Sequence, residues 1–276
     1  MRIMIKCVLF SLILICCAAC GPSAKKDISS GIVSLSPSIT RGIIDLGAED
    51  LLVGVTSYHP PLSRKIESVG SLNLPHLEKI LLLKPELVLF SEEDALTQRL
   101  EALESSGLRL HKFVRNTNFS DICANYIELG KLTDREDEAR RKAAIYADAL
   151  SKLKRNNREI SLLVLVSHEP LITVSGMSFI GEIINDAGGR NIFADAPRPY
   201  PIINVESVVR KSPDAVIIMS GGGVEYFREK TGAFPIKALI NNNVFKIEHE
   251  HAAYYTPSDY VAAVKDFISI LDSVKL

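Results

Sequence analysis

The amino-acid sequence predicts an α/β protein of two Rossmann-like lobes, each with a central, mostly parallel sheet. One long α-helix joins the lobes, and a ligand cleft is expected between them. Three observations support this prediction. Short apolar strands alternate with amphipathic helices in both halves of the chain. A helix–proline–strand pattern occurs once in each half, and the longest helical pattern of the chain lies between the halves.

The composition is that of an ordinary globular protein. The chain has 276 residues, of which 47% are hydrophobic and 24% are charged. Its formal net charge is −1 and it contains no basic block, so we expect no nucleic-acid partner. Four of the five cysteines fall within the first twenty residues. The remaining one, Cys123, therefore has no partner for an internal disulfide.

The N-terminal segment has the pattern of an export signal. Two basic residues precede an apolar run at 8–15, which is too short to span a bilayer. Two alanines and then Cys20 follow, and this small–small–Cys order resembles a bacterial lipobox. We expect residues 1–19 to be a lipoprotein signal peptide and residues 20–30 to be a tether, lipidated at Cys20. The mature protein would then be exported to the periplasmic or cell-surface side and anchored to a membrane. A plain secretory signal is the alternative.

The N-terminal lobe is predicted over residues 31–132. Its strands are expected at 32–35, 51–55, 86–90 and 108–114. Its helices are expected at 39–46, 77–83 and 96–105. Ser38 is a favourable N-cap residue for the first helix, and Gly47 is suited to end it. Pro85 cannot continue the second helix and therefore marks its end.

A linking backbone helix is predicted over residues 133–158. Thr133 and Glu136 have the spacing of a capping box. Apolar residues then follow at alternating four- and three-residue steps, which places them on one face of a helix. They are Ala139, Ala143, Tyr146, Leu150 and Leu153.

The C-terminal lobe is predicted over residues 159–276. Its strands are expected at 162–166, 215–219 and 244–247. Its helices are expected at 179–187, ending at Gly188, and at 259–271, where an amphipathic helix closes the chain.

An internal repeat relates the two lobes. Residues 77–89 and 205–217 each place a glutamate, Glu78 or Glu206, seven residues before a proline, and an apolar strand follows. Two lobes of like construction favour a cleft between them, because α/β sheets bind ligands beyond the carboxyl ends of their strands. Helix–proline–strand units are common in α/β proteins, but the matched spacing and the shared glutamate favour a duplication.

Several segments in order along the chain resemble a known family. It comprises the helical-backbone (class III) periplasmic solute-binding proteins, which serve ABC importers of cobalamin, haem and iron-siderophores. The resemblance lies in residues 32–40, 52–58, 77–88, 188–195 and 198–201. It implies a receptor that captures an iron complex or cobalamin and delivers it to an ABC permease dimer and its ATPase subunits. Where this family has Thr-Glu after the first loop, this chain has Thr40-Arg41.

The resemblance also gives the two repeated glutamates a role. In this family such a pair, one per lobe, docks the receptor onto two permease subunits, so Glu78 and Glu206 are the expected permease-docking residues. The alternative is that both are acids favoured by the dipole at the start of a short helix.

The ligand cleft should be lined by loops at the ends of strands. The expected ligand-cleft residues are Ser36, Pro37, Ser38, Tyr58, His59, Ser91, His168, Arg198, Tyr200, His251, Tyr254 and Tyr255. Aromatic faces with phenol or imidazole groups suit a large, flat, partly apolar ligand, and Tyr or His can ligate a haem-type iron. Cobalamin binders of this family typically place Trp in the cleft, and this chain has no Trp.

Two other functions are alternatives to this receptor. One is a Zn- or Mn-type metal receptor, which the size of the bound ligand would distinguish. His249-Glu250-His251 is not a convincing metal site, because alternate residues on an extended segment supply only two ligands, and no metal-ligating residues are assigned. An exported α/β hydrolase would need a nucleophile and base at a recognisable spacing, which the chain lacks. We therefore expect no catalysis and no cofactor, although the bound ligand would contain iron or cobalt.

Overall fold

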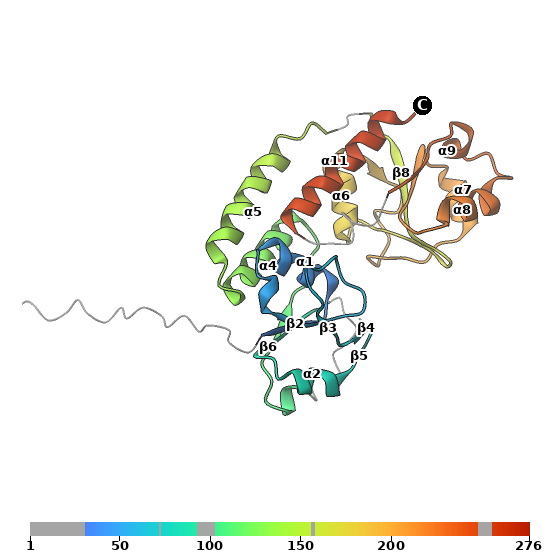
Figure 1. The fold of residues 1–276 in the computed structure, drawn as a ribbon. Coiled ribbons are helices and arrows are strands. Elements are labelled where there is room, and N and C mark those ends of the chain that lie inside the picture. The colour runs from blue at the N-terminus through green and yellow to red at the C-terminus, as the bar shows by residue number, and fades with distance from the viewer. Residues whose placement is uncertain (1–30, 72, 93–102, 156–157, 248–255) are drawn as a thin grey trace, which may run out of the picture.

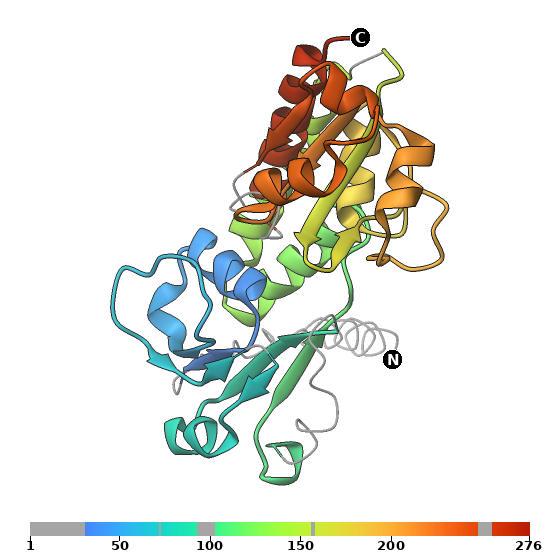
Figure 2. The ribbon, with the colours of Figure 1, turned by 90° about the vertical axis from the view of Figure 1, so that its right-hand side faces the viewer.

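The protein has two α/β lobes joined by a pair of helices (Figures 1 and 2). The computed structural model describes residues 31–71, 73–92, 103–155, 158–247 and 256–276. The predicted signal peptide and tether, and most of the helix predicted over 96–105, lie outside these residues. Within the described ranges, no helix combines the length and apolarity needed to cross a membrane.

The N-terminal lobe contains a five-stranded parallel sheet in the order β3-β2-β1-β6-β7. Its strands are β1 (Ile32–Ser34), β2 (Leu52–Val55), β3 (Glu67–Ser68), β6 (Leu87–Ser91) and β7 (Leu110–Phe113). Successive residues point to opposite faces of the sheet, so Ile32 and Val33 enter two different hydrophobic clusters. A two-stranded antiparallel ribbon, β4 (Gly70–Ser71) and β5 (Leu74–Pro75), leads into α2.

The helices of this lobe are α1 (Pro37–Asp45), the 3₁₀ turn η1 (Glu49–Leu51) and α2 (Leu77–Leu83). The prediction that Ser38 caps α1 is wrong. The helix begins at Pro37, with Ser36 as the N-cap residue and Ser38 inside the first turn. Proline is favoured at this first position because its fixed φ suits the helix and its missing N–H would have no partner there.

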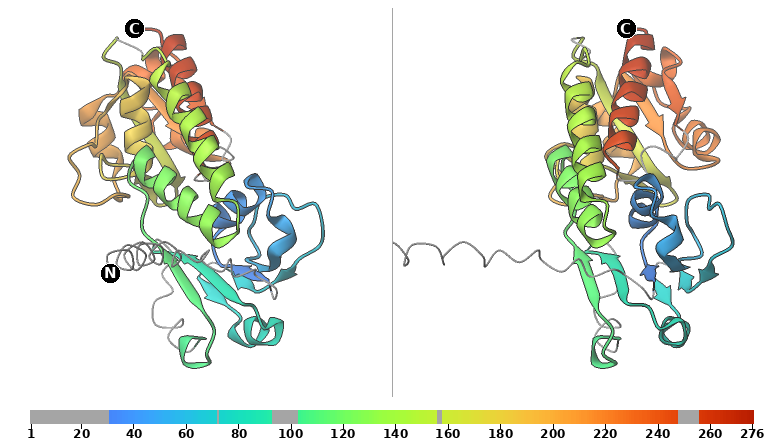
Figure 3. Two further views of the ribbon diagram at one scale, coloured as in Figure 1. Left: turned by 90° about the vertical axis from the view of Figure 1, so that its left-hand side faces the viewer. Right: turned by 60° about the vertical axis from the view of Figure 1, so that its left-hand side comes forward.

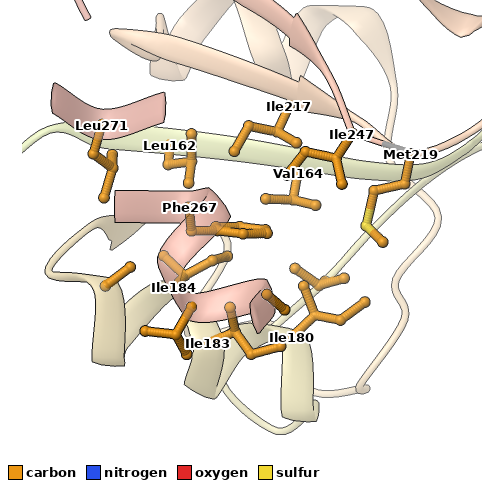
Figure 4. Close-up of a cluster of buried hydrophobic side chains, with 14 of the residues drawn as sticks. Leu162, Val164, Ile180, Ile183, Ile184, Ile217, Met219, Ile247, Phe267 and Leu271 are labelled. Atoms are coloured by element: carbon orange, nitrogen blue, oxygen red, sulfur yellow. The ribbon is translucent and has the colours of Figure 1, made fainter. Parts of the chain in front are cut away.

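The C-terminal lobe contains a second parallel sheet in the order β10-β8-β11-β12, with β9 antiparallel to β8. Its strands are β8 (Ser161–His168), β9 (Leu171–Thr173), β10 (Arg190–Asn191), β11 (Ala215–Ile218) and β12 (Val244–Lys246). Its helices are α6 (Phe179–Ala187), α7 (Val205–Lys211), α8 (Gly223–Thr231), α9 (Lys237–Ile240) and α11 (Pro257–Ser273). Figure 4 shows Leu162, Val164 and Ile217 of the sheet facing side chains of α6 and α11.

The link between the lobes is a helical hairpin of α4 (Phe119–Leu132) and α5 (Glu136–Ser151). The linking helix is therefore shorter than the predicted 133–158, and α4 was not predicted at all. The proposed capping box is wrong, because Thr133 ends α4 and its hydroxyl donates to the Leu129 carbonyl at 2.8 Å. A Cβ atom on Gly130 would lie 2.6 Å from Cβ of Ala139, so glycine permits the two helices to approach closely at the turn.

Both linking helices pack against both lobes (Figure 3). On α4, Ile122 is buried in the core of the C-terminal lobe, whereas Tyr126 is buried in the core of the N-terminal lobe. On α5, Ala139 belongs to the N-terminal core and Leu150 packs against the C-terminal core. The link is thus part of both hydrophobic cores.

Two aspartates at equivalent places bond to neighbouring helices: Asp45 to both helices of the link, and Asp186 to α11 and the segment that follows α5. Asp45, at the end of α1, accepts a hydrogen bond from the Tyr126 hydroxyl, and Nζ of Lys142 lies 3.2 Å from its Oδ2. Asp186, near the end of α6, accepts a hydrogen bond from the Tyr260 hydroxyl at 2.8 Å and another from Arg155 at 2.9 Å. Each aspartate stands two residues before a glycine of positive φ. The internal repeat therefore includes these anchors as well as the sheets.

Candidate ligand-binding site

Each sheet has a point at which the chain reverses its direction of winding. In the N-terminal lobe β2 and β3 lie on one side of β1, and β6 and β7 lie on the other. In the C-terminal lobe β10 lies on one side of β8, and β11 and β12 lie on the other. Open α/β sheets bind ligands beyond the carboxyl ends of the strands at such switch points. The arrowhead of β8 points toward the N-terminal lobe in Figure 2.

Serine and threonine hydroxyls organise the switch point of the N-terminal lobe. The Thr40 hydroxyl donates to Oγ of Ser34 at 2.8 Å and to the Ser36 carbonyl at 3.0 Å. Oγ of Ser36 and Oγ of Ser38 are 3.0 Å apart. These bonds fix the turn that contains Ser36, Pro37 and Ser38, so its hydroxyls are held in place before any ligand arrives.

A small hollow lies at the same edge of the sheet. The predicted residues Ser38 and Ser91 both line it, together with Phe113, Asn116 and Asn125. Its volume of about 30 Å³ admits water but not a tetrapyrrole. The structure thus brings two predicted residues together at one margin of the proposed site. Asn125 was missed because its helix, α4, was not predicted; the signal was Asn118 followed by apolar residues at helical spacing.

Tyr58 and His59 follow β2 at this edge. The Thr56 hydroxyl donates to the Tyr58 carbonyl at 2.6 Å, and Nδ1 of His59 lies 2.8 Å from the Pro60 carbonyl. The Tyr58 side chain is 60% exposed. The backbone is therefore fixed, while an aromatic face stays available to a ligand.

His168 marks the switch point of the C-terminal lobe. It is the last residue of β8, and its Nδ1 lies 2.9 Å from Oγ of Ser220, which follows β11. Its ring packs against Tyr226 of α8 with centroids 5.2 Å apart. Among the residues described by the structure, no carboxylate is hydrogen-bonded to His168.

Arg198 and Tyr200 lie on the loop between β10 and α7, and both are exposed. Backbone N–H groups of Thr173 and Ser175 donate to carbonyls on this loop at 3.1 and 2.9 Å, which fixes its course beside β9. The remaining predicted cleft residues, His251, Tyr254 and Tyr255, lie outside the described residues, as does Cys20. In the part of the chain that is described, no three His, Cys, Asp or Glu side chains gather as metal ligands would.

An ion pair crosses from one lobe to the other. Nε and Nη2 of Arg41, on α1, donate to the two carboxylate oxygens of Asp259, on α11, at 3.3 and 3.2 Å. The Asp259 side chain is 4% exposed, and the Thr256 hydroxyl donates to it at 2.5 Å. In the sequence, Arg41 stands where the resembled family has glutamate, but its partner Asp259 could not be recognised there.

Comparison with known proteins decides the family. The profile described as periplasmic binding protein matches residues 32–250. This chain belongs to the periplasmic binding protein family. A vitamin B12-binding protein of Photorhabdus laumondii is 30% identical over 196 residues, which cover 69% of this periplasmic binding protein and 70% of the relative.

Solved structures of periplasmic binding proteins have the same fold as this chain. The periplasmic vitamin B12-binding protein of Vibrio cholerae has a TM-score of 0.75 at 24% identity and covers 88% of this chain and 96% of its own. The periplasmic haem-binding protein of the same species has a TM-score of 0.77 at 21% identity, with 88% and 99% covered. The two-lobed α/β fold and the class III resemblance are confirmed. The relatives and the fold are those of substrate-binding proteins rather than enzymes, and members of this extracytoplasmic family carry ligands rather than cofactors.

Proposed function

We propose that this periplasmic binding protein captures cobalamin, haem or a siderophore-bound iron and delivers it to an ABC importer. The observation that carries the proposal is the placement of exposed Tyr58 and fixed hydroxyls at strand ends of the N-terminal sheet, and of His168 and Ser220 at strand ends of the C-terminal sheet. Large, partly apolar ligands are held by such surfaces, where a few polar groups set the orientation. Relatives named as vitamin B12-binding proteins support this class of ligand.

Tyr58 and Tyr200 are the proposed aromatic contacts, one from each lobe. They are 60% and 40% exposed, so a flat macrocycle can stack on either ring without unfolding a core. His59 and His168 are the imidazoles placed to hydrogen-bond or ligate a metal-containing ligand. Ser36, Pro37, Ser38, Ser91 and Arg198 complete the proposed contacts in the described residues.

Delivery depends on Glu78 and Glu206 in this proposal. Each occupies the second position of a seven-residue helix, α2 or α7, and each is exposed. Neither carboxylate forms a hydrogen bond or ion pair within the described part of the chain. Two unpaired acids at equivalent positions are suited to basic pockets on two permease subunits, which would steer and align the complex. Lipidation at Cys20 would keep the receptor beside that importer.

A titration of the purified, ligand-free protein tests the function. Cyanocobalamin, haemin, a ferric hydroxamate siderophore and ZnCl₂ are added separately, and binding is followed by absorption spectra and equilibrium dialysis. We expect saturable binding of at least one of the first three. Binding of Zn²⁺ alone would instead identify a metal receptor and contradict the proposal.

Substitutions locate the site once a ligand has been identified. Tyr58→Ala and Tyr200→Ala should each weaken its affinity by about tenfold, since each removes one stacking face. Tyr146→Ala on the linking helix α5 serves as the control and should bind as the unaltered protein does. Unchanged affinity in both cleft variants would show that the ligand lies elsewhere.

A further inference from the structure

Each lobe presents an exposed aliphatic residue four positions before its repeated glutamate. In the N-terminal lobe Leu74 precedes Glu78, and in the C-terminal lobe Ile202 precedes Glu206. The side chains of Leu74 and Ile202 are 50% and 72% exposed. We name residues 74–84 the N-tip and residues 202–212 the C-tip. Figure 1 places their helices, α2 and α7, far from α5.

The helices of the two tips are built alike. In both, an extended residue caps a seven-residue helix whose second residue is the glutamate. In both, the helix ends at a left-handed residue, Lys84 with φ 46° or Ser212 with φ 39°, and a proline follows. The aliphatic residue therefore lies two positions before the helix cap, and the glutamate two positions after it, in each tip.

A single exposed aliphatic side chain does not indicate an interface, because such residues are common on the surface of soluble domains. Its occurrence at the same position in both tips does favour one. An exposed aliphatic residue, leucine or isoleucine, and an acid without a partner among the described residues recur at the same spacing on both tips. Interfaces commonly combine a dry apolar contact, which supplies affinity, with a charge at the rim, which sets encounter rate and register.

We propose that Leu74 and Ile202 are the paired apolar contacts of the importer-docking surface. Each would insert beside its glutamate into a pocket that is apolar at one side and basic at the other. Because the two tips repeat one pattern, the partner presents this pocket twice, as two identical permease subunits related by a two-fold axis would. This inference rests on the proposed function and adds the apolar half of the contact.

One of the exposed positions at which the tips differ provides a matched control. Leu82 is 80% exposed on α2, four residues after Glu78, and the equivalent residue on α7 is Arg210. A partner with two equal halves already accepts arginine at this position in the C-tip. Leu82→Arg should therefore preserve docking, whereas Leu74→Arg should not. The two variants make the same chemical change on the same tip.

The first measurement is site-specific crosslinking in living cells. A photoreactive phenylalanine analogue replaces residue 74, 78, 202 or 206 in the full chain, and residue 145 on α5 is the control, since Ile145 is 49% exposed. We expect the four tip positions to crosslink to one and the same ABC permease polypeptide, identified by mass spectrometry, and position 145 to give no permease crosslink. If none of the four tip positions reaches a permease, the docking proposal itself fails.

The second measurement is the affinity of the ligand-free protein for that importer in lipid nanodiscs. Leu74→Arg and Ile202→Arg should each weaken binding by tenfold or more, and Leu82→Arg by less than about threefold. If positions 78 and 206 crosslink but the Leu74 and Ile202 variants bind as Leu82→Arg does, the glutamates dock without the aliphatic pair and this inference is wrong. It is also wrong if Leu74→Arg or Ile202→Arg abolishes binding of cyanocobalamin, haemin and the ferric hydroxamate, because these residues would then belong to the ligand site.

Discussion

Arg41 of the N-terminal lobe and Asp259 of the C-terminal lobe form a two-point ion pair across the lobe boundary. The aspartate is almost fully buried, whereas the arginine side chain is 34% exposed. A buried carboxylate that loses its cation stays desolvated and poorly compensated. The pair therefore couples the position of α1 to the first turn of α11.

Removing the Arg41 cation alone should destabilise the protein more than removing the charges of both Arg41 and Asp259. Arg41→Ala should lower the free energy of unfolding by about 2 kcal/mol, because Asp259 stays buried. The additional change Asp259→Asn should recover part of that loss. Urea unfolding of the single and double variants measures the coupling. The exposed pair Arg140–Glu136 is the control, and its loss should cost about 0.5 kcal/mol or less.

Reversing the charge of the docking glutamates should impair transport without impairing the receptor. Glu78→Arg or Glu206→Arg should leave folding and ligand affinity unchanged, since both side chains are exposed and outside the cores. Uptake by cells should fall, and the double variant should be worse than either single variant. The defect of each single variant should depend on salt, because screening weakens exposed charges. Normal uptake by the double variant would leave the helix-dipole interpretation in place.

The lobes should move little when ligand binds. Both linking helices are packed into both cores, so a large hinge motion would have to pull buried side chains such as Ile122 and Tyr126 out of contact. Spin labels at residues 82 and 210 report the separation of the tips. We expect the distance distribution with ligand to overlap the one without it. A shift larger than the width of the distribution would place the protein among receptors that close by a hinge.

The two phenol–carboxylate contacts should contribute independently to stability. Tyr126→Phe and Tyr260→Phe should each cost about 1.5 kcal/mol, because each removes a hydrogen bond to a partly buried carboxylate. The two sites belong to different lobes and share no partner, so their effects should add. Chemical denaturation of the two single variants and the double variant tests the sum.

These tyrosines also predict sensitivity to alkali. Burial and the hydrogen bond to an aspartate raise the pKa of Tyr126 and of Tyr260 above the ordinary value of 10. Below pH 10 each tyrosine contributes its full amount to the free energy of unfolding. Above pH 10 this contribution declines, because the tyrosines ionise in the unfolded state at a lower pH than in the folded state. Stability should therefore fall as the pH rises past 10, and by less in the double phenylalanine variant. Equal alkaline slopes in the two proteins would contradict the assignment.

The sequence was sufficient for the architecture but not for contacts between distant segments. Buried strands such as β6 and the repeated helix–proline–strand units could be predicted because their signals are local. Helix α4 was missed because strand-like and polar residues precede it, and Thr133 was assigned to the wrong helix because it can cap one helix or end another. The Arg41–Asp259 pair could not be predicted, since 218 residues separate its partners.

The positions of the candidate site residues could be predicted from the sequence only in part. Ser38 and Ser91 could be placed at one sheet edge because parallel strands bring their carboxyl ends together. The contact between His168 and Ser220 depends on the neighbouring positions of β8 and β11, which strand order determines and single-sequence patterns do not.

The α4–α5 hairpin has a mechanical consequence for transport. A single helix between two bodies resists bending but lets them twist about its axis, whereas two helices packed side by side also resist torsion. If the lobes move as little as predicted, the spacing and relative orientation of Glu78 and Glu206 stay the same whether or not ligand is bound. An importer that binds the receptor through Glu78 and Glu206 would then find these two residues at the same separation in the ligand-bound and the ligand-free receptor. Such an importer would then have to distinguish the two forms by the ligand itself.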